Sequence, residues 1–172
     1  MNKISFRKLN DRKVDYLKLY KWCQNKFVYE WFEQRKLSYD EIVDKYKTKL
    51  KEKKQELFII KADDIDIGLV QIYRFDNDIE IDVDGNVYEY DLFIGEEEYL
   101  DKGIGKEIVN KVNDIIYSKH NANFIILRPF ERNIRAIKCY EKCGFKTILK
   151  YLGKDTLGND EVISVLYAEK ED

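Results

Sequence analysis

The chain has 172 residues, of which 44% are hydrophobic and 14% aromatic, and its formal net charge is −2. This length and composition suit a single domain over residues 1–172 with a hydrophobic core, and the weakly negative charge argues against a nucleic-acid-binding protein. No segment has the character of a signal peptide or a membrane span, so we expect a cytoplasmic protein with no membrane partner.

The first half of the chain predicts two helices and three strands. In chain order these are a strand at residues 4–9, a helix at about 15–23, a helix at about 38–54, and strands at 57–61 and 67–73. The second helix has the clearest start, because Ser38 followed by Glu41 is a capping box. A polar turn, Asp63 to Asp66, joins the last two strands.

The middle of the chain is strongly acidic. Between Arg74 and Lys102 there is no Lys or Arg, whereas eleven Asp and Glu residues fall in this segment. Apolar residues at 79, 81 and 83 alternate as in a strand, and Asp84-Gly85 is typical of a hairpin turn. Such a segment would attract a cationic ligand, and it is equally consistent with a solvated hairpin.

The second half predicts helices alternating with strands. In order these are a strand at 88–94, a helix ending near His120, a strand at 124–127, a helix at 133–145, and strands near 146–151 and 161–168. The fold class is therefore α/β, with a central, mostly antiparallel sheet and flanking helices. Only the strands at 88–94 and 124–127, joined by a crossover helix, should be parallel.

A glycine-containing turn, Lys102 to Lys106, opens the helix that ends near His120. Backbone N–H groups in the first turn of a helix have no partner within the helix and lie at the positive end of its dipole. Because glycine also allows a ligand to approach the backbone closely, the turn is a candidate phosphate site.

The three cysteines favour a reducing compartment, because Cys23, Cys139 and Cys143 are an odd number without CxxC spacing. Cys139 and Cys143 lie one helical turn apart and could share a metal, but the chain has only one histidine, His120, to complete such a site. Packing is the favoured interpretation, and we expect no metal.

These motifs together resemble the GNAT superfamily of acetyl-coenzyme A-dependent N-acetyltransferases. The resemblance is carried by the Gly-x-Gly core of Lys102 to Lys106 and by the run from Asn133 to Phe145, with its Asn, Ala, Tyr and Gly-Phe. Within this superfamily the chain resembles in particular the bacterial aminoglycoside 6'-N-acetyltransferases, and this similarity runs from about Leu17 to Phe145. It is carried by Trp22, the cluster at 28–31, the strand at 67–73 and Asp91. The resemblance to the superfamily implies the GNAT fold, which is also called the acyl-CoA N-acyltransferase fold.

The resemblance implies acetyl-CoA as the donor and assigns residues to it. The pyrophosphate would bind the N–H groups of the glycine turn, and the pantetheine arm would pair with the strand at 88–94. The N–H of Phe93 or Ile94 would polarise the thioester carbonyl, and Asn133 would bind the arm, cap its helix, or do both. The expected cofactor-binding residues are Phe93, Ile94, Lys102, Gly103, Ile104, Gly105, Lys106, Asn133 and Ala136.

Two side chains match the catalytic residues of the superfamily. Asp91 would serve as general base or would anchor the amine, and Tyr140 would protonate the departing thiolate. The alternatives are an exposed acid in an acidic segment and a tyrosine packed on the sheet. No cysteine lies where the family would form an acyl-enzyme, so we expect direct transfer within a ternary complex.

The resemblance also assigns residues to an acceptor pocket. The residues assigned to it are Tyr29, Glu30, Trp31, Phe32, Glu89, Asp91 and Arg128. The aromatic cluster could instead be core packing between two helices. Arg128 stands where the resistance enzymes have an acid, so it would repel a polycation unless Glu131 neutralises it or it turns away.

Three functions remain open at this point. The favoured one is acetylation of an aminoglycoside or a related small amine by a monomer or homodimer. The second is acetylation of a protein N-terminus, a lysine or a siderophore precursor, and the third is an acyl-CoA-binding sensor without turnover.

Overall fold

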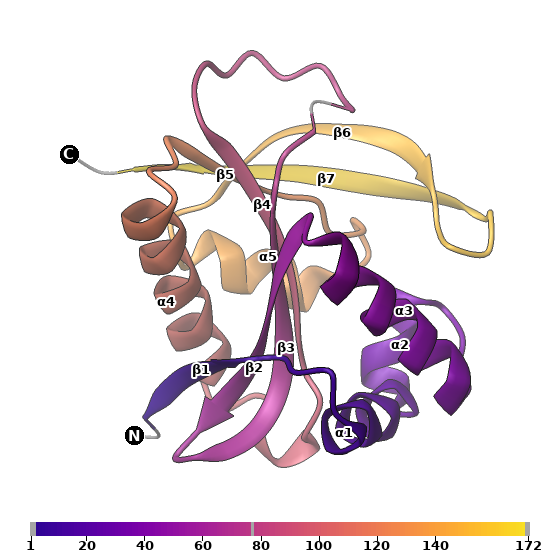
Figure 1. The fold of residues 1–172 in the computed structure, drawn as a ribbon. Coiled ribbons are helices and arrows are strands. Elements are labelled where there is room, and N and C mark those ends of the chain that lie inside the picture. The colour runs from indigo at the N-terminus through magenta and orange to yellow at the C-terminus, as the bar shows by residue number, and fades with distance from the viewer. Residues whose placement is uncertain (1–2, 77, 171–172) are drawn as a thin grey trace.

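The computed structural model describes residues 3–76 and 78–170 and contains a seven-stranded sheet with the strand order β1-β2-β3-β4-β5-β7-β6 (Figure 1). Only β4 and β5 pair in parallel, and the other neighbours are antiparallel, which confirms the predicted fold class. The strands are β1 (Ile4–Lys8), β2 (Gln55–Ala62), β3 (Ile65–Arg74), β4 (Val87–Ile94), β5 (Phe124–Leu127), β6 (Lys146–Lys154) and β7 (Asp160–Glu169).

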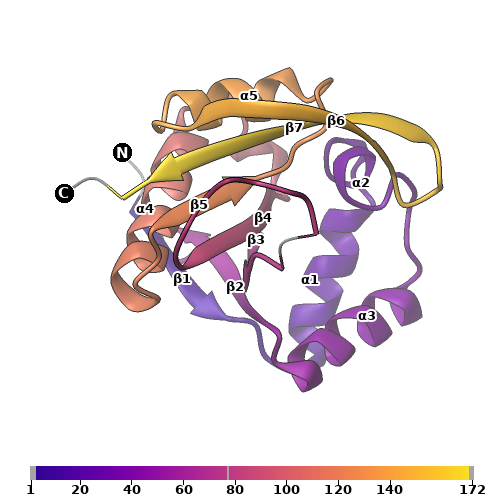
Figure 2. The same ribbon diagram turned by 90° about the horizontal axis from the view of Figure 1, so that it is seen from above.

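The helices lie against both faces of this sheet. They are α1 (Lys13–Cys23), α2 (Lys26–Phe32), α3 (Tyr39–Glu52), α4 (Ile104–Lys119) and α5 (Ile134–Glu141), with a short 3-10 turn, η1, at Glu97–Tyr99. Figures 1 and 2 show α1–α3 and α4 on opposite sides of β2–β4. Within the described residues, no helix combines the length and apolar character needed to cross a bilayer.

Alternate residues of the central strands pack into two separate cores. Val70 on β3 and Tyr90 on β4 face the α4 side, where they pack with Ile108 and its neighbours. Leu69 and Phe93 face the other side, where they join α1–α3. Because side chains alternate across a strand, the odd-numbered residues of β4, including Glu89 and Asp91, lie on the α1–α3 face.

The parallel pair is short, and this opens the sheet at one point. Residues 87–89 of β4 are in register with residues 124–126 of β5, and no pairing between these two strands continues beyond Glu89. The opposite edge of β5 is paired with β7 over its whole length. The C-terminal half of β4, from Tyr90 to Ile94, therefore has β3 on one side and an open edge on the other.

The strand-like alternation at residues 79, 81 and 83 and the turn signal at Asp84-Gly85 do not produce a hairpin, since no strand occurs in the described residues between Arg74 and Val87. β3 and β4 pair directly up to the bond from Phe75 N–H to Val87 O, 3.0 Å, and β5 occupies the other edge of β4. Both edges of β4 at residues 87–89 are thus occupied, so the intervening segment does not pair with this part of β4. Its alternating apolar residues instead pack on a small cluster around Phe75 and Ile126.

Two helices also differ from the prediction. The aromatic segment at 26–32 forms α2. The helix predicted for 133–145 ends at Glu141, because Gly144 adopts a φ of 90° and the N–H of Phe145 turns back to the carbonyl of Tyr140, 3.1 Å away. A left-handed residue with a returning N–H is a common way for a helix to end.

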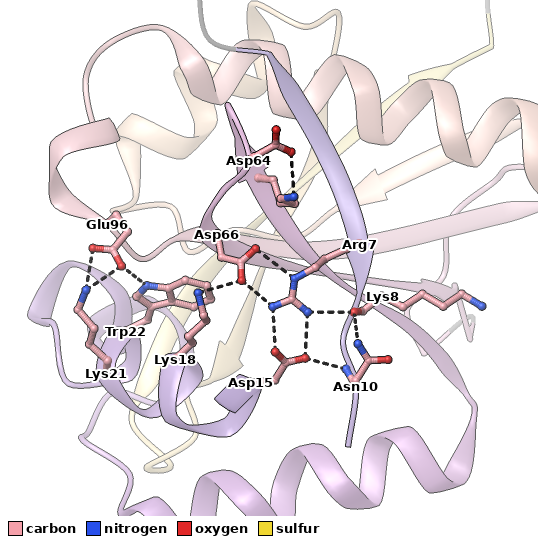
Figure 3. A network of polar contacts seen from close by, with 11 residues as sticks. Arg7, Lys8, Asn10, Asp15, Lys18, Lys21, Trp22, Asp64, Asp66 and Glu96 are labelled. Atoms are coloured by element: carbon pink, nitrogen blue, oxygen red, sulfur yellow. Dashed lines mark hydrogen bonds and ion pairs between the residues drawn. The ribbon is translucent and has the colours of Figure 1, made fainter. Parts of the chain in front are cut away.

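A group of paired charges, the Arg7 network, joins β1, α1 and β3. It consists of Arg7, Asp15, Lys18 and Asp66 (Figure 3). The Arg7 guanidinium donates to Asp15 at 2.8 and 3.0 Å and to Asp66 at 2.6 and 3.1 Å, and Lys18 Nζ lies 2.9 Å from Asp66. Asp15 is only 2% exposed, so the network attaches α1 to the sheet through a buried carboxylate.

Candidate active site

A cleft of about 310 Å³ opens where β4 and β5 separate. Its walls come from β4, α2, the segment that joins β5 to α5, and the facing sides of α4 and α5. Of the predicted site residues, the cleft is lined by Trp31, Phe32, Asp91, Phe93, Ile94, Gly105, Arg128, Asn133, Ala136 and Tyr140. Residues predicted from distant parts of the chain thus share one cavity.

The edge of β4 that faces the cleft carries unpaired N–H groups. The antiparallel pairing of β3 and β4 has a hydrogen bond at each end. At one end Gly95 N–H donates to Ile67 O at 2.7 Å, and at the other Phe75 N–H donates to Val87 O. Because bonded pairs alternate along such a ladder, Phe93 bonds to β3 whereas Leu92 and Ile94 direct their N–H groups away from it. Of the two predicted donors to a thioester, Ile94 is the one on the open edge.

The start of α4 has the geometry expected of the glycine turn. Gly103 is the N-cap, with a φ of 76° that favours glycine, and Ile104 and Gly105 begin the helix. Their N–H groups have no partner within the helix, whereas Lys106 N–H reaches Gly103 O at 3.2 Å. Lys102, Gly103 and Lys106 are exposed beside the cleft, and the Ile104 side chain is in the core, so only its backbone can face a ligand.

Gly105 and Asn133 shape the space between α4 and α5. A Cβ at Gly105 would come within 3.4 Å of Cys139 Sγ, so a larger side chain here would narrow the cleft. Asn133 is the N-cap of α5, and its Oδ1 accepts a hydrogen bond from Ala136 N–H at 3.2 Å. The capping role predicted for Asn133 is therefore present, and contact with a cofactor arm stays a prediction.

Asp91 lies in a polar group on the α1–α3 face, the Asp91 cluster, which consists of Lys49, Gln71, Tyr73 and Asp91. The Tyr73 hydroxyl donates to Asp91 Oδ2 at 2.8 Å, and Gln71 stands opposite Asp91 on β3. Asp91 is exposed by surface area because it faces the cleft, although many protein atoms crowd around its carboxylate. Burial raises its pKa above the usual value, against the opposing effects of the Tyr73 hydrogen bond and of Lys49 and Arg128.

Tyr140 lines the same cleft from α5. Its ring packs against Phe145, with centroids 5.9 Å apart, and joins the α4 core, so it is also a packing residue. Burial raises the pKa of its hydroxyl, and the negative charge of Asp91 raises it further. Tyr140 is therefore protonated at neutral pH and has a proton to donate.

Arg128 is neutralised, but not by the predicted partner. Its guanidinium makes a bidentate pair with Glu89 at 2.7 and 2.8 Å and a second with Asp78 at 2.8 and 2.7 Å. Glu131 instead pairs with Lys150. Glu89 is only 3% exposed and is not one of the residues that line the cleft. Burial raises the pKa of its carboxyl group to about 7, although the Arg128 guanidinium opposes this shift. Two carboxylates offset one cation, so Arg128 presents no net positive charge.

The aromatic cluster serves both the core and the cleft. Phe32 packs edge-on against Phe93 at 5.0 Å, and Trp31 lies under the guanidinium of Arg132 at 4.8 Å. Tyr29 and Glu30 are not among the lining residues, whereas Phe27 is one that sequence reasoning missed. Phe27 and Trp31 are four residues apart, so recognising α2 as a helix would have placed them on one face.

Several other lining residues were not predicted, among them Tyr90, Leu92, Leu100, Val109, Phe130, Arg135 and Cys139. Most are apolar residues of the α4 core or of loops, and apolar spacing alone does not distinguish a cleft wall from a core. Arg135 Nε lies 3.3 Å from Asp101 Oδ1, just before the glycine turn. This contact joins two exposed residues near the start of α4 and α5.

The chain is similar to known acetyltransferases. The family model described as "Acetyltransferase (GNAT) domain" matches residues 11–150. The aminoglycoside N(6')-acetyltransferase type 1 of Klebsiella pneumoniae is 26% identical over 139 residues, which cover 77% of this chain and 69% of the relative.

Solved structures show the same fold. The aminoglycoside acetyltransferase AAC(6')-Ib, crystallised with coenzyme A and kanamycin, matches with a TM-score of 0.82 at 21% identity, over 98% of this chain and 95% of that one. The spermidine N-acetyltransferase of Vibrio cholerae, in complex with CoA and spermine, matches with a TM-score of 0.77 at 21% identity, over 96% and 95% of the two chains. Since the family model spans most of its length, the chain belongs to the GNAT family of acetyltransferases.

Proposed function

We propose that the protein transfers the acetyl group of acetyl-CoA directly to a primary amine of a small acceptor, with Asp91 as base and Tyr140 as acid. The observation that carries this proposal is that Asp91 and Tyr140, from β4 and α5, line one cleft at the open edge of β4. A carboxylate with a raised pKa and a protonated phenol form the acid and base pair that such a transfer needs.

The donor fits the backbone groups beside this pair. The N–H groups of Ile104 and Gly105, at the start of α4, would hold the pyrophosphate, and the positive φ of Gly103 keeps this turn free of a side chain. The open edge of β4 would pair with the pantetheine arm as an added strand does. Asn133 and Ala136 would contact the arm from α5.

Each catalytic group has one proton to move. Asp91 would take the proton that the amine loses as its nitrogen bonds to the carbonyl carbon. Ile94 N–H would donate to the oxyanion of the tetrahedral intermediate, a contribution typically worth about 10²–10³ in rate. As the carbon–sulfur bond breaks, Tyr140 would give its proton to the thiolate and regain one from solvent.

Aminoglycosides are the first acceptors to test, and polyamines the next. Relatives named for aminoglycosides and for spermidine share the fold, and Trp31, Phe32 and Phe27 offer aromatic faces for a sugar or an alkyl chain. The neutralisation of Arg128 by Glu89 and Asp78 removes the repulsion of a polycation that the sequence predicted.

The test is a steady-state assay with acetyl-CoA against kanamycin, spermidine and a lysine peptide. We expect turnover with at least one small amine and a preference for it over the peptide. Binding of coenzyme A without turnover on any amine would favour the sensor function, and failure to bind coenzyme A by calorimetry would remove the basis of the proposal.

A further inference from the structure

Lys49 is a cation beside Asp91 without an acidic partner. Its ammonium donates to Gln71 Oε1 at 2.5 Å and approaches Gln55 Oε1 at 3.5 Å, and both of these are neutral carboxamides. No ion pair among the described residues includes Lys49 or Asp91. An ammonium has three donors, so one remains available to a ligand.

The neighbouring cations differ from Lys49 in this respect. Lys45, one turn earlier on α3, is paired with Glu33. Arg128 is held by Glu89 and Asp78 through four hydrogen bonds. Among these three described cations, Lys49 is thus the one without a carboxylate partner, although its ammonium also lies over the Tyr46 ring, 5.9 Å from the centroid.

Lys49 and Asp91 lie close enough for one small molecule to contact both. Gln71 and Asp91 are opposite residues on β3 and β4 and point to the same face, where opposite Cβ atoms are about 4.5–5.5 Å apart. Lys49 Nζ contacts the end of the Gln71 side chain, and the second oxygen of Asp91 is left free by Tyr73. Lys49, half-buried on α3, is therefore a neighbour of Asp91 on the α1–α3 face, and Asp91 lines the cleft.

We propose that Lys49 forms an anion subsite next to Asp91, so that the acceptor is an amine that also carries a carboxylate or similar anionic group a few bonds away. This inference rests on the proposed acetyl transfer and narrows its acceptor. The amine of such a molecule approaches Asp91 while its anionic group binds Lys49, and both charges are satisfied. A polycation would satisfy Asp91 and leave Lys49 unopposed.

Matched pairs of amines test the subsite directly. Lysine and cadaverine, and ornithine and putrescine, differ only in the carboxylate. We expect the carboxylate-bearing member of each pair to have the higher kcat/KM, by roughly 10- to 100-fold, as for hydrogen bonds to charged groups. Kanamycin, which has no carboxylate, serves as the polycationic comparison.

Variants of Lys49 separate an anion subsite from a structural role. Lys49→Gln keeps a donor for Gln71 but removes the charge, and it should abolish the preference by raising KM for the carboxylate-bearing amine alone. Lys49→Arg should restore most of the preference. Lys47→Gln, at an exposed position of the same helix, is the matched control and should change nothing.

Two results would overturn the subsite. One is a wild-type enzyme that acetylates cadaverine or kanamycin at least as well as lysine, which leaves the proposed function in place. The other is an equal loss on both members of a pair in Lys49→Gln, which would mean that Lys49 only compensates Asp91. Absence of turnover on every amine would instead defeat the proposed function, and this inference with it.

Discussion

The Arg7 network and the Asp91 cluster contain the same kinds of side chain and behave in opposite ways. In the Arg7 network burial would raise the pKa of Asp15, but hydrogen bonds from Arg7 and from Asn10 N–H lower it by more. Burial prevails at Asp91, which has a tyrosine hydroxyl but no cation in direct contact, and its pKa is raised. Complete pairing thus makes a charge structural, whereas incomplete pairing beside a cleft leaves it available for chemistry.

The largest effect should follow from removing the incompletely paired acid. Asp91→Asn keeps the shape of the side chain but cannot accept the amine proton, so we expect kcat to fall about 10³-fold with coenzyme A affinity unchanged. Steady-state kinetics and calorimetry measure the two quantities. Asp82→Asn, in the exposed acidic segment, is the control. Equal losses of turnover and of coenzyme A affinity would contradict the role of Asp91 as base or amine anchor.

Tyr140→Phe should have the second largest effect, with a fall in kcat of about 10²-fold. The loss is smaller than at Asp91 because a thiolate leaves more readily than most leaving groups, even without an acid. Packing against Phe145 should survive, since only the hydroxyl is removed. Tyr151→Phe on β6, outside the cleft, is the matched control. A variant with normal kcat would return Tyr140 to the packing role that the sequence left open.

Removing a paired acid should affect stability and spare catalysis. Asp15→Asn breaks the charge-assisted contact with Arg7 in a buried site, and we expect the free energy of unfolding to fall by about 2 kcal/mol. Denaturant titration measures this change. The kcat of the folded enzyme should be unaffected. A tenfold fall in kcat with unchanged stability would mean that the two groups of charges are not functionally separate.

Local signals in the sequence predicted much of the fold, and contacts between distant residues account for the errors. The capping box of Ser38 and Glu41 is present at the start of α3 because both partners lie within one turn. α2 has no such signal: Asn25 makes no side-chain cap and instead donates to Gly95 O at 3.1 Å, seventy residues away in the chain.

The same distinction applies to the site. Asp91, Gly105, Asn133 and Tyr140 belong to motifs with fixed spacing, and the structure brings them to one cleft. The partners of Arg128 could not be predicted, because Glu89 and Asp78 are 39 and 50 residues away whereas Glu131 is a near neighbour in sequence. Lys49 could not be singled out from the sequence either, because it is one of several lysines on an amphipathic helix. Only its tertiary contact with Gln71 distinguishes it.

Charge removal at Lys49 should change the pH dependence of turnover as well as acceptor choice. Asp91 must be ionised to act as base, so activity falls as the pH drops through its raised pKa. Lys49 favours the ionised form of Asp91, so in Lys49→Gln that pKa rises further and the acidic limb of kcat/KM should move to higher pH, by roughly 0.5–1 unit. A limb that stays in place would show that the two groups are not coupled. A limb that moves to lower pH would contradict the assignment to Asp91.

The smallest effect should come from an exposed pair, which sharpens the contrast with the Arg7 network. Lys21 Nζ lies 2.8 Å from Glu96 Oε1, but 65% of the lysine side chain is exposed. Lys21→Met should therefore change the free energy of unfolding by no more than about 0.5 kcal/mol, since solvent screens the pair. Glu96 also keeps its hydrogen bond from Trp22 Nε1 at 2.8 Å. A loss as large as that of Asp15→Asn, in the same denaturant titration, would mean that burial is not what distinguishes the structural charges of this protein.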